Sequence, residues 1–171
     1  MLKIIGAILI CGGTATIGFS AANQLMMRIK ILNIWLGILD TMHSEIKFML
    51  TPLNELMIKC LMQAEEPVKS FFQKVIENFR KNVDALFGEA WINALSDCDF
   101  LGLVGQEKQI ISDLGNVLGR YDANEQALRI EHIRKAVENR AKIAENEKNK
   151  LGKLYSSLGV ACGIALVIVF I

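Results

Sequence analysis

The chain has 171 residues, of which 52% are apolar and 22% charged, so it has room for one domain of ordinary size. Lys and Arg together number 19 and Asp and Glu 18, which excludes the strong positive field typical of nucleic-acid-binding proteins. Only two prolines occur and strand-type alternation is missing, which predicts an all-α protein. The four cysteines lack C-x-x-C spacing, which favours reduced thiols instead of a disulfide framework.

The N-terminal segment, residues 1–22, is almost free of charge. One lysine precedes about nineteen uncharged residues, which as a helix would cover roughly 28 Å and span a bilayer. A cleaved signal peptide ending at Ser20-Ala21-Ala22 is the competing interpretation. Because the apolar periodicity continues without a break beyond this point, we expect an uncleaved transmembrane anchor.

Two proline-containing signals divide the front half of the body into helices. From Leu25 to Leu50, apolar residues recur at steps of three and four, as in a helix that packs in a bundle. Thr51 can cap a new helix, and Pro52 suits its first turn because proline has no amide hydrogen to leave unpaired. We therefore expect one helix to end near Leu50 and another to begin at Pro52. Glu66-Pro67 should start a third, which runs to about Asn82.

Glycines mark the next helices. A short helix around Trp91 and a connector at residues 97–105 precede a helical pattern over Gln106–Gly119. Gly115 inside that helix costs about 1 kcal/mol relative to alanine, so we expect another helix to approach closely there. Gly119 is interpreted as the helix terminator.

The last helix begins at Asp122, which forms a capping-box pattern with Glu125 three residues later. Its predicted buried face consists of small and branched apolar residues at helical spacing: Ala127, Ile130, Ile133, Val137, Ala141 and Ala144. From residue 145 to residue 150 the sequence is almost wholly polar. We expect that portion to leave the bundle as a solvated stalk.

The C-terminal segment, residues 154–171, carries no charge and is predicted to be a second transmembrane helix. Gly159 and Gly163 have the G-x-x-x-G spacing that lets another membrane helix approach. Seven basic residues flank the two segments on the side of the body: Arg28, Lys30, Arg140, Lys142, Lys148, Lys150 and Lys153. Because basic residues favour the cytoplasmic side, the body at residues 23–153 should be cytoplasmic.

The sequence carries no recognisable catalytic, metal-binding or cofactor-binding motif. His43 and His132 lie far apart, without a metal-ligand partner at helical spacing. Gly102 and Gly105 lack the lysine and the strand context of a phosphate-binding loop. We therefore expect no enzyme and no cofactor. The prediction is an antiparallel bundle of about six helices, flanked by the two transmembrane helices and acting as a scaffold. A membrane-anchored signalling or sensor module is the alternative.

Three motifs stand in a characteristic order along the chain. Glu45-Ile46 is followed by Thr51-Pro52-Leu53, then L-G-x-x-L-G-x-x-D-x-x-x-Q runs from Leu114 to Gln126, and K-L-Y-x-x-L-G-x-x-x-G runs from Lys153 to Gly163. With these motifs and an M-L-K start, the chain resembles the stage III sporulation protein AB family from end to end.

This resemblance implies a helical domain similar to the cytoplasmic F domain of type II secretion and type IV pilus platform proteins. Members of the family belong to the sporulation channel between mother cell and forespore and sit in the mother-cell membrane. The implied partners are a secretion-type ATPase, stage III sporulation protein AA, and other channel subunits; a homo-oligomer is an open alternative. Glu45, Asp122 and Gln126 match family positions and are the candidate partner contacts.

Overall fold

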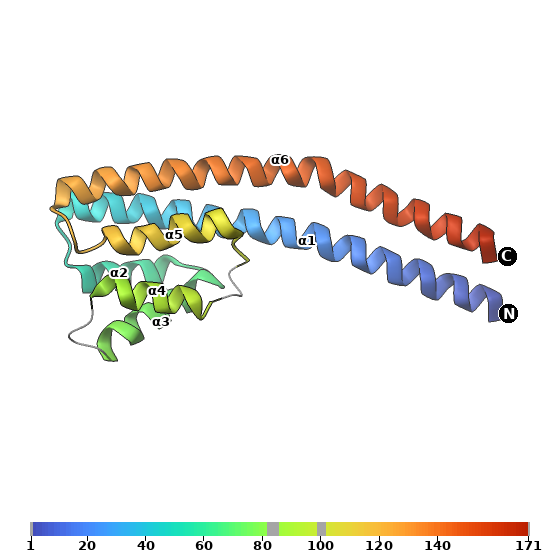
Figure 1. Ribbon diagram of the computed structural model, residues 1–171, viewed down its shortest axis with the longest axis horizontal. Coiled ribbons are helices and arrows are strands. Elements are labelled where there is room, and N and C mark those ends of the chain that lie inside the picture. Colours follow the sequence, from blue (N-terminus) through green and yellow to red (C-terminus); the bar gives the residue numbers. More distant parts are fainter. Residues whose placement is uncertain (1, 82–85, 99–101, 171) are drawn as a thin grey trace. The chain divides into compact units, whose positions relative to one another are not determined.

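The computed structural model is all-α in the part of the chain that it describes (Figure 1). It describes the backbone of residues 2–81, 86–98 and 102–170, and the side chains of residues 20, 23–81, 86–98 and 102–151. The elements in chain order are α1 (Leu2–Ser44), a π-helical turn η1 (Glu45–Met49), α2 (Leu53–Gln63), α3 (Val68–Lys81), α4 (Phe87–Ser96), α5 (Gly105–Val117) and α6 (Ala123–Phe170). The predicted all-α class is confirmed.

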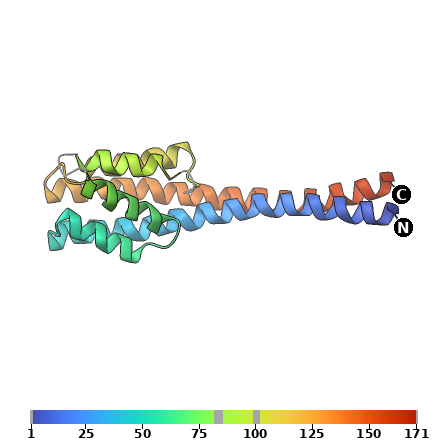
Figure 2. The ribbon, with the colours of Figure 1, turned by 90° about the horizontal axis from the view of Figure 1, so that it is seen from below.

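The chain forms two compact units, which we describe separately. The first unit contains the residues of α1 up to Ile29 and the residues of α6 from Lys142 onward. The two helices run side by side in both views of the ribbon (Figures 1 and 2). Arg28 Nη1 donates a hydrogen bond to Glu147 Oε2 at 2.6 Å. Residues 145–150 lie outside the bundle unit, Lys30–Ala141, and are exposed or half-buried, as predicted. They do not stand free, however, because this ion pair ties the stretch to α1.

The predicted membrane anchors fall on side chains that the structure does not describe. Residues 1–22 and 154–171, with Gly159 and Gly163, lie outside the residues whose side chains are described, apart from Ser20, although the backbone of residues 2–22 and 154–170 is helical. Within the described residues, no helix is both long enough and apolar enough to cross a membrane. The anchors and the domain boundaries at residues 22 and 153 stay predictions.

The second unit, Lys30–Ala141, is built around four aromatic rings. Trp35 of α1, Phe71 and Phe72 of α3 and Trp91 of α4 are fully buried. Their ring centroids lie 4.8 to 6.1 Å apart, mostly edge to face, which is the favoured geometry for aromatic pairs. Trp91 Nε1 also donates a hydrogen bond of 2.8 Å to the carbonyl oxygen of Ile111, so the core joins α1, α3, α4 and α5.

The predictions for Gly115 and Gly119 are confirmed. A Cβ atom on Gly115 would lie 2.3 Å from Trp91 Cδ1, so α4 and α5 pack so closely that only glycine fits. Gly119 has a φ of +75°, the left-handed conformation that follows many helix ends, and α5 ends two residues before it.

The predicted helix starts are confirmed to within a residue, but one predicted cap is wrong. The helical run through η1 ends at Met49, and α2 begins directly after Pro52. No side chain caps α2, because the Thr51 hydroxyl donates its hydrogen bond to the Glu45 carboxylate instead.

Of the capping box predicted at the start of α6, the part played by Asp122 is confirmed. Asp122 Oδ1 accepts hydrogen bonds from the backbone N–H groups of Asn124 and Glu125, both at 3.0 Å. The Glu125 carboxylate binds Arg129 one turn later. The buried face is as predicted, with Ile133 half-buried and the others buried: Ala127, Ile130, Val137, Ala141 and Ala144.

Candidate functional site

Residues 45–52, which we call the 45–52 turn, expose an apolar surface. Phe48, Met49 and Leu50 are 68%, 71% and 69% exposed, although each is a large apolar side chain. Single exposed apolar residues are ordinary on protein surfaces, but contiguous ones mark interaction sites. Among the described residues, this is the longest run of such side chains along the chain.

Glu45 holds the 45–52 turn in place with both its backbone and its side chain. Its carbonyl oxygen accepts hydrogen bonds from the N–H groups of Leu50 and Thr51. Its Oε2 atom accepts from Lys59 Nζ at 2.6 Å and from Thr51 Oγ1 at 2.5 Å. The hydrogen bond from Lys59, and then that from Thr51, lower the pKa of Glu45 below its usual value. Glu45, predicted as a partner contact, is thus a positioning residue for the turn.

The pH dependence of Glu45→Gln tests this role. Because the folded-state pKa is lowered, the carboxylate stabilises the fold fully above the ordinary carboxyl pKa of about 4.3 and loses that contribution as pH falls through the lowered value. We expect Glu45→Gln to lower the denaturation midpoint at neutral pH, and the difference from wild type to shrink as the pH is lowered. Glu145→Gln, at an exposed position of α6, should leave the denaturation midpoint unchanged at neutral pH and at acidic pH. A difference that stays constant with pH would contradict the role.

Leu50 adopts a backbone conformation that leucine avoids. Its φ and ψ are 52° and 36°, in the left-handed region, where the Cβ atom crowds the backbone. Such strained residues persist only where their surroundings fix them, and they cluster at functional sites. The two N–H bonds to the Glu45 carbonyl provide that fixation.

Replacing Leu50 with glycine is expected to stabilise the fold. Glycine removes a strain of about 1–2 kcal/mol but adds freedom to the unfolded chain, so the net gain should be about 0.5 kcal/mol. Met49→Gly is the matched control, because Met49 is equally exposed but lies in the helical turn η1 and has no left-handed backbone to relieve. It should lower stability by about 1 kcal/mol in a denaturation experiment, as glycine does inside a helix. A loss of stability in Leu50→Gly would show that the leucine side chain, not its backbone, matters for folding.

A groove of about 250 Å³ lies beside the 45–52 turn. Its walls come from the turn itself, the start of α2, the α5–α6 loop and the first turn of α6: Ile46, Leu50, Thr51, Leu53, Leu56, Gly119, Ala123 and Gln126. Leu53 approaches Gly119 so closely that a Cβ atom there would lie 3.2 Å from Leu53 Cδ2. Segments far apart in the sequence thus form one mainly apolar concavity.

Gln126 lines this groove, and Asp122 lies in the loop before it. Gln126 Nε2 donates to the carbonyl oxygen of Tyr121 at 2.5 Å, and its Oε1 accepts from the N–H of Gly119 at 3.4 Å. Gln126 therefore closes the α5–α6 loop, and Asp122 caps α6. The three candidate contacts, Glu45, Asp122 and Gln126, all support the walls of one surface. Their contact with a partner stays a prediction.

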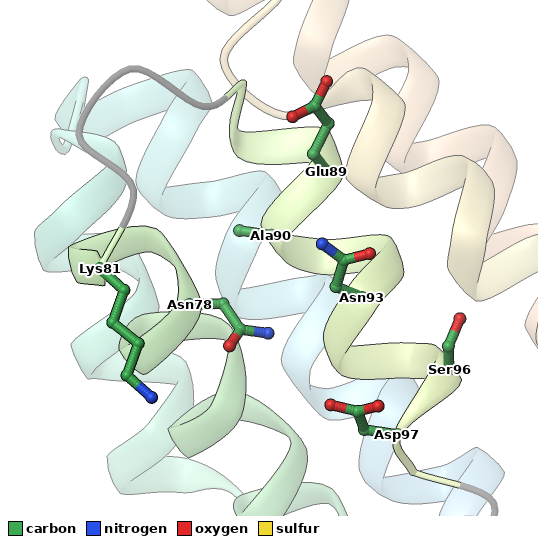
Figure 3. Close-up of a pocket in the computed structure, with 7 residues that line it drawn as sticks. All are labelled: Asn78, Lys81, Glu89, Ala90, Asn93, Ser96 and Asp97. Carbon is green, nitrogen blue, oxygen red and sulfur yellow. The ribbon is translucent and has the colours of Figure 1, made fainter.

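A second cleft, which the sequence did not indicate, lies between α3 and α4 and measures about 320 Å³. Its walls are mostly polar: Asn78, Lys81, Glu89, Ala90, Asn93, Ser96 and Asp97 (Figure 3). Asn78 extends from α3 toward α4 in that view. Nowhere among the described residues do three or more His, Cys, Asp or Glu side chains gather as metal ligands. The amides and carboxylates of this cleft offer hydrogen bonds but no nucleophile–base pair.

Glu107 is a buried acid that the helical pattern also failed to reveal. It is 1% exposed, and its Oε1 lies 3.6 Å from Arg140 Nε. Its Oε2 accepts the N–H of Val104 at 3.1 Å, as a glutamate at the third position of a helix commonly does. The position of a glutamate at the third residue of the helix was the one signal in the sequence for this contact. The pair joins α5 to α6 and lies apart from the groove-lining residues, so we assign it a structural role.

Comparisons with known proteins bear on the whole chain. A family model described as stage III sporulation protein AB matches residues 3–171. One relative, the stage III sporulation protein AB of Bacillus subtilis strain 168, is 27% identical over 169 residues, covering 98% of each chain. A solved structure of a stage III sporulation protein AB matches with a TM-score of 0.66 and 24% identity, covering 72% of this chain and 98% of that one. The chain belongs to the stage III sporulation protein AB family.

Proposed function

We propose that this protein is a non-enzymatic platform subunit of the sporulation channel between mother cell and forespore. In this role it is anchored in the mother-cell membrane by residues 1–22 and 154–171, with the body at residues 23–153 in the cytoplasm. It docks a cytosolic secretion-type ATPase, stage III sporulation protein AA, and contacts other channel subunits. Membership in the sporulation family supports the cellular role. The partner and the membrane topology rest on the resemblance and on the charge distribution of the sequence.

The observation that carries a docking function is the exposed 45–52 turn beside the groove. A scaffold needs a defined surface for its partner and no reacting groups. Phe48, Met49 and Leu50 supply large apolar side chains, and Glu45 fixes their backbone. Asp122 and Gln126 fix the opposite wall, where they remain candidate contacts.

A binding measurement with the full-length protein in detergent tests the docking function. The immobilised protein should bind the cognate ATPase saturably, and a denatured sample should not bind it. Absence of binding by the full-length, folded protein, in the presence and in the absence of nucleotide, would overturn the proposal.

Thiol labelling on intact cells tests the topology. The described native thiols are poor targets, because Cys60 and Cys98 are buried and burial raises the pKa of the Cys60 thiol to about 12. We would therefore introduce a cysteine by Met62→Cys, at a position that is 80% exposed. An impermeant maleimide should label this variant above the background of the parent protein only after the membrane is permeabilised. Labelling of intact cells would place the body outside the cytoplasm.

A further inference from the structure

Leu50 forms the rim of the groove. It lines the concavity and yet is 69% exposed, so its side chain is available to both the groove and an arriving molecule. Phe48 and Met49 extend the same apolar surface along the 45–52 turn. A volume of about 250 Å³ suits one large apolar side chain with part of its backbone. The shape therefore favours a partner that inserts an apolar anchor residue.

The surface is already in a fixed conformation before anything binds. The Glu45 carbonyl holds the Leu50 and Thr51 amides, and the Glu45 carboxylate is bound by Lys59. A preformed site loses little conformational entropy on binding, which raises the affinity for a given buried area.

Two exposed cations adjoin the groove-lining residues and favour an acidic partner. Lys47 follows the groove-lining Ile46, and Arg120 follows the groove-lining Gly119. Both cations are exposed, and within the described part of the chain neither forms an ion pair; Lys47 only lies over the ring of its neighbour Phe48, at 5.4 Å. They remain available to an opposite charge on a partner.

The carboxylates of the same region are largely engaged within the protein. Lys59 binds Glu45, Asp122 caps α6, and Arg129 binds Glu125. Glu55, in the first turn of α2, and Asp122 are exposed, and Asp122 keeps its charge while it caps the helix. Lys47 and Arg120 are the cations next to the groove-lining Ile46 and Gly119, so they are the charges that an acidic partner at the groove would meet.

We infer that the groove binds a large apolar side chain carried on an acidic segment of the docked ATPase, with Lys47 and Arg120 contacting the acidic residues. This inference rests on the proposed function and assigns its docking surface.

A second copy of this chain fits less well, because a two-fold interface over the groove would bring the same cations of both copies together. A lipid surface would need apolar side chains that insert, but it would leave the concavity without an occupant.

Binding of the cognate ATPase to full-length variants in detergent tests the assignment. Leu50→Gly removes the rim side chain while relieving backbone strain, so the variant should fold. We expect its dissociation constant to rise at least tenfold. Lys47→Glu combined with Arg120→Glu should weaken binding at least tenfold and make the remaining binding less sensitive to salt.

Two matched controls change equally exposed residues elsewhere. Leu86→Gly removes a leucine that is 75% exposed, and Lys69→Glu reverses an exposed lysine of α3. Both should bind the ATPase within twofold of wild type.

The outcomes separate the two proposals. If wild type binds and the groove variants bind equally well, the groove assignment is overturned and the platform function stands. If folded wild type does not bind at all, the platform function fails and the assignment fails with it.

If Leu50→Gly abolishes self-association in the absence of the ATPase, the groove belongs to a second copy. If a Phe48 photo-crosslinker in the membrane-bound protein labels only lipid, the occupant is a membrane surface. Either result overturns the inference.

Discussion

Gly115→Ala should lower the free energy of unfolding by about 3 kcal/mol, because it forces a side chain into a fully packed contact. The added methyl would lie 2.3 Å from Trp91 Cδ1, 2.4 Å from Cγ and 2.8 Å from Cβ. These atoms are close to the backbone of α4, and Trp91 is held at its far end by the hydrogen bond to Ile111. The tryptophan therefore cannot rotate away, and the helices must separate. The gain of about 1 kcal/mol that alanine brings to a helix interior is smaller than this loss.

Gly105→Ala is the matched control for that experiment. Gly105 begins the same helix, and a Cβ atom there would meet nothing within 4 Å. Chemical denaturation of the full-length protein should show a stability equal to or slightly above that of wild type. If Gly115→Ala behaved like this control, the close packing of α4 and α5 would be refuted.

Arg140→Met should destabilise the protein by about 3 kcal/mol, because it removes the cation opposite a buried acid. Glu107 is 1% exposed, and the side chain of Arg140 is 19% exposed, so water screens the pair poorly. Arg140 Nη1 also donates to Gln106 Oε1 at 3.0 Å, which fixes the guanidinium. The charge of Glu107 would lose this compensation in the variant, whereas methionine could fill most of the volume.

The double variant Glu107→Gln, Arg140→Met distinguishes loss of charge pairing from loss of packing. Glutamine keeps an acceptor for the N–H of Val104 but carries no charge. The double variant should therefore recover at least half of the stability lost in Arg140→Met. As a control, Arg129→Met breaks an exposed pair with Glu125 and should cost less than about 1 kcal/mol. A double variant as unstable as Arg140→Met would assign the loss to packing.

Local signals predicted most of the helices, because each depended on a few neighbouring residues. Pro52 and Pro67 precede α2 and α3, Asp122 caps α6, and Gly119 follows the end of α5. Gly115 was predictable because a glycine inside a helix needs a packing reason, although its neighbour, Trp91, was not.

Long-range pairings were not predictable in the same way. Arg28 and Glu147 are 119 positions apart, so a polar stretch that was tied to α1 looked like a free stalk. Glu107 occupies a position that a helical pattern assigns to the surface, and its burial is accompanied by its contacts with Arg140 and with the N–H of Val104. Thr51 could cap a helix or bind a carboxylate, and the choice depended on the fold of η1.

In the candidate site, too, the sequence indicated single residues but not the long-range contacts between them. The family motifs pointed to Glu45, Asp122 and Gln126, but a motif does not say whether a residue touches a partner or holds the backbone. The structure gives Glu45 three hydrogen-bonding neighbours in the 45–52 turn and α2. The exposed Leu50 and the groove beside it follow from the meeting of four segments, which no local pattern contains.

The aromatic core has an optical consequence. The protein contains two tryptophans, Trp35 and Trp91; both are fully buried, and their ring centroids lie 6.1 Å apart. Their emission should be that of indoles in an apolar environment, and aqueous quenchers should not reach them. Intrinsic fluorescence therefore reports on the integrity of the core, whereas an event at the exposed 45–52 turn should leave it unchanged. Intrinsic fluorescence can consequently follow unfolding while an extrinsic dye attached at the 45–52 turn reports separately on that surface in the same sample.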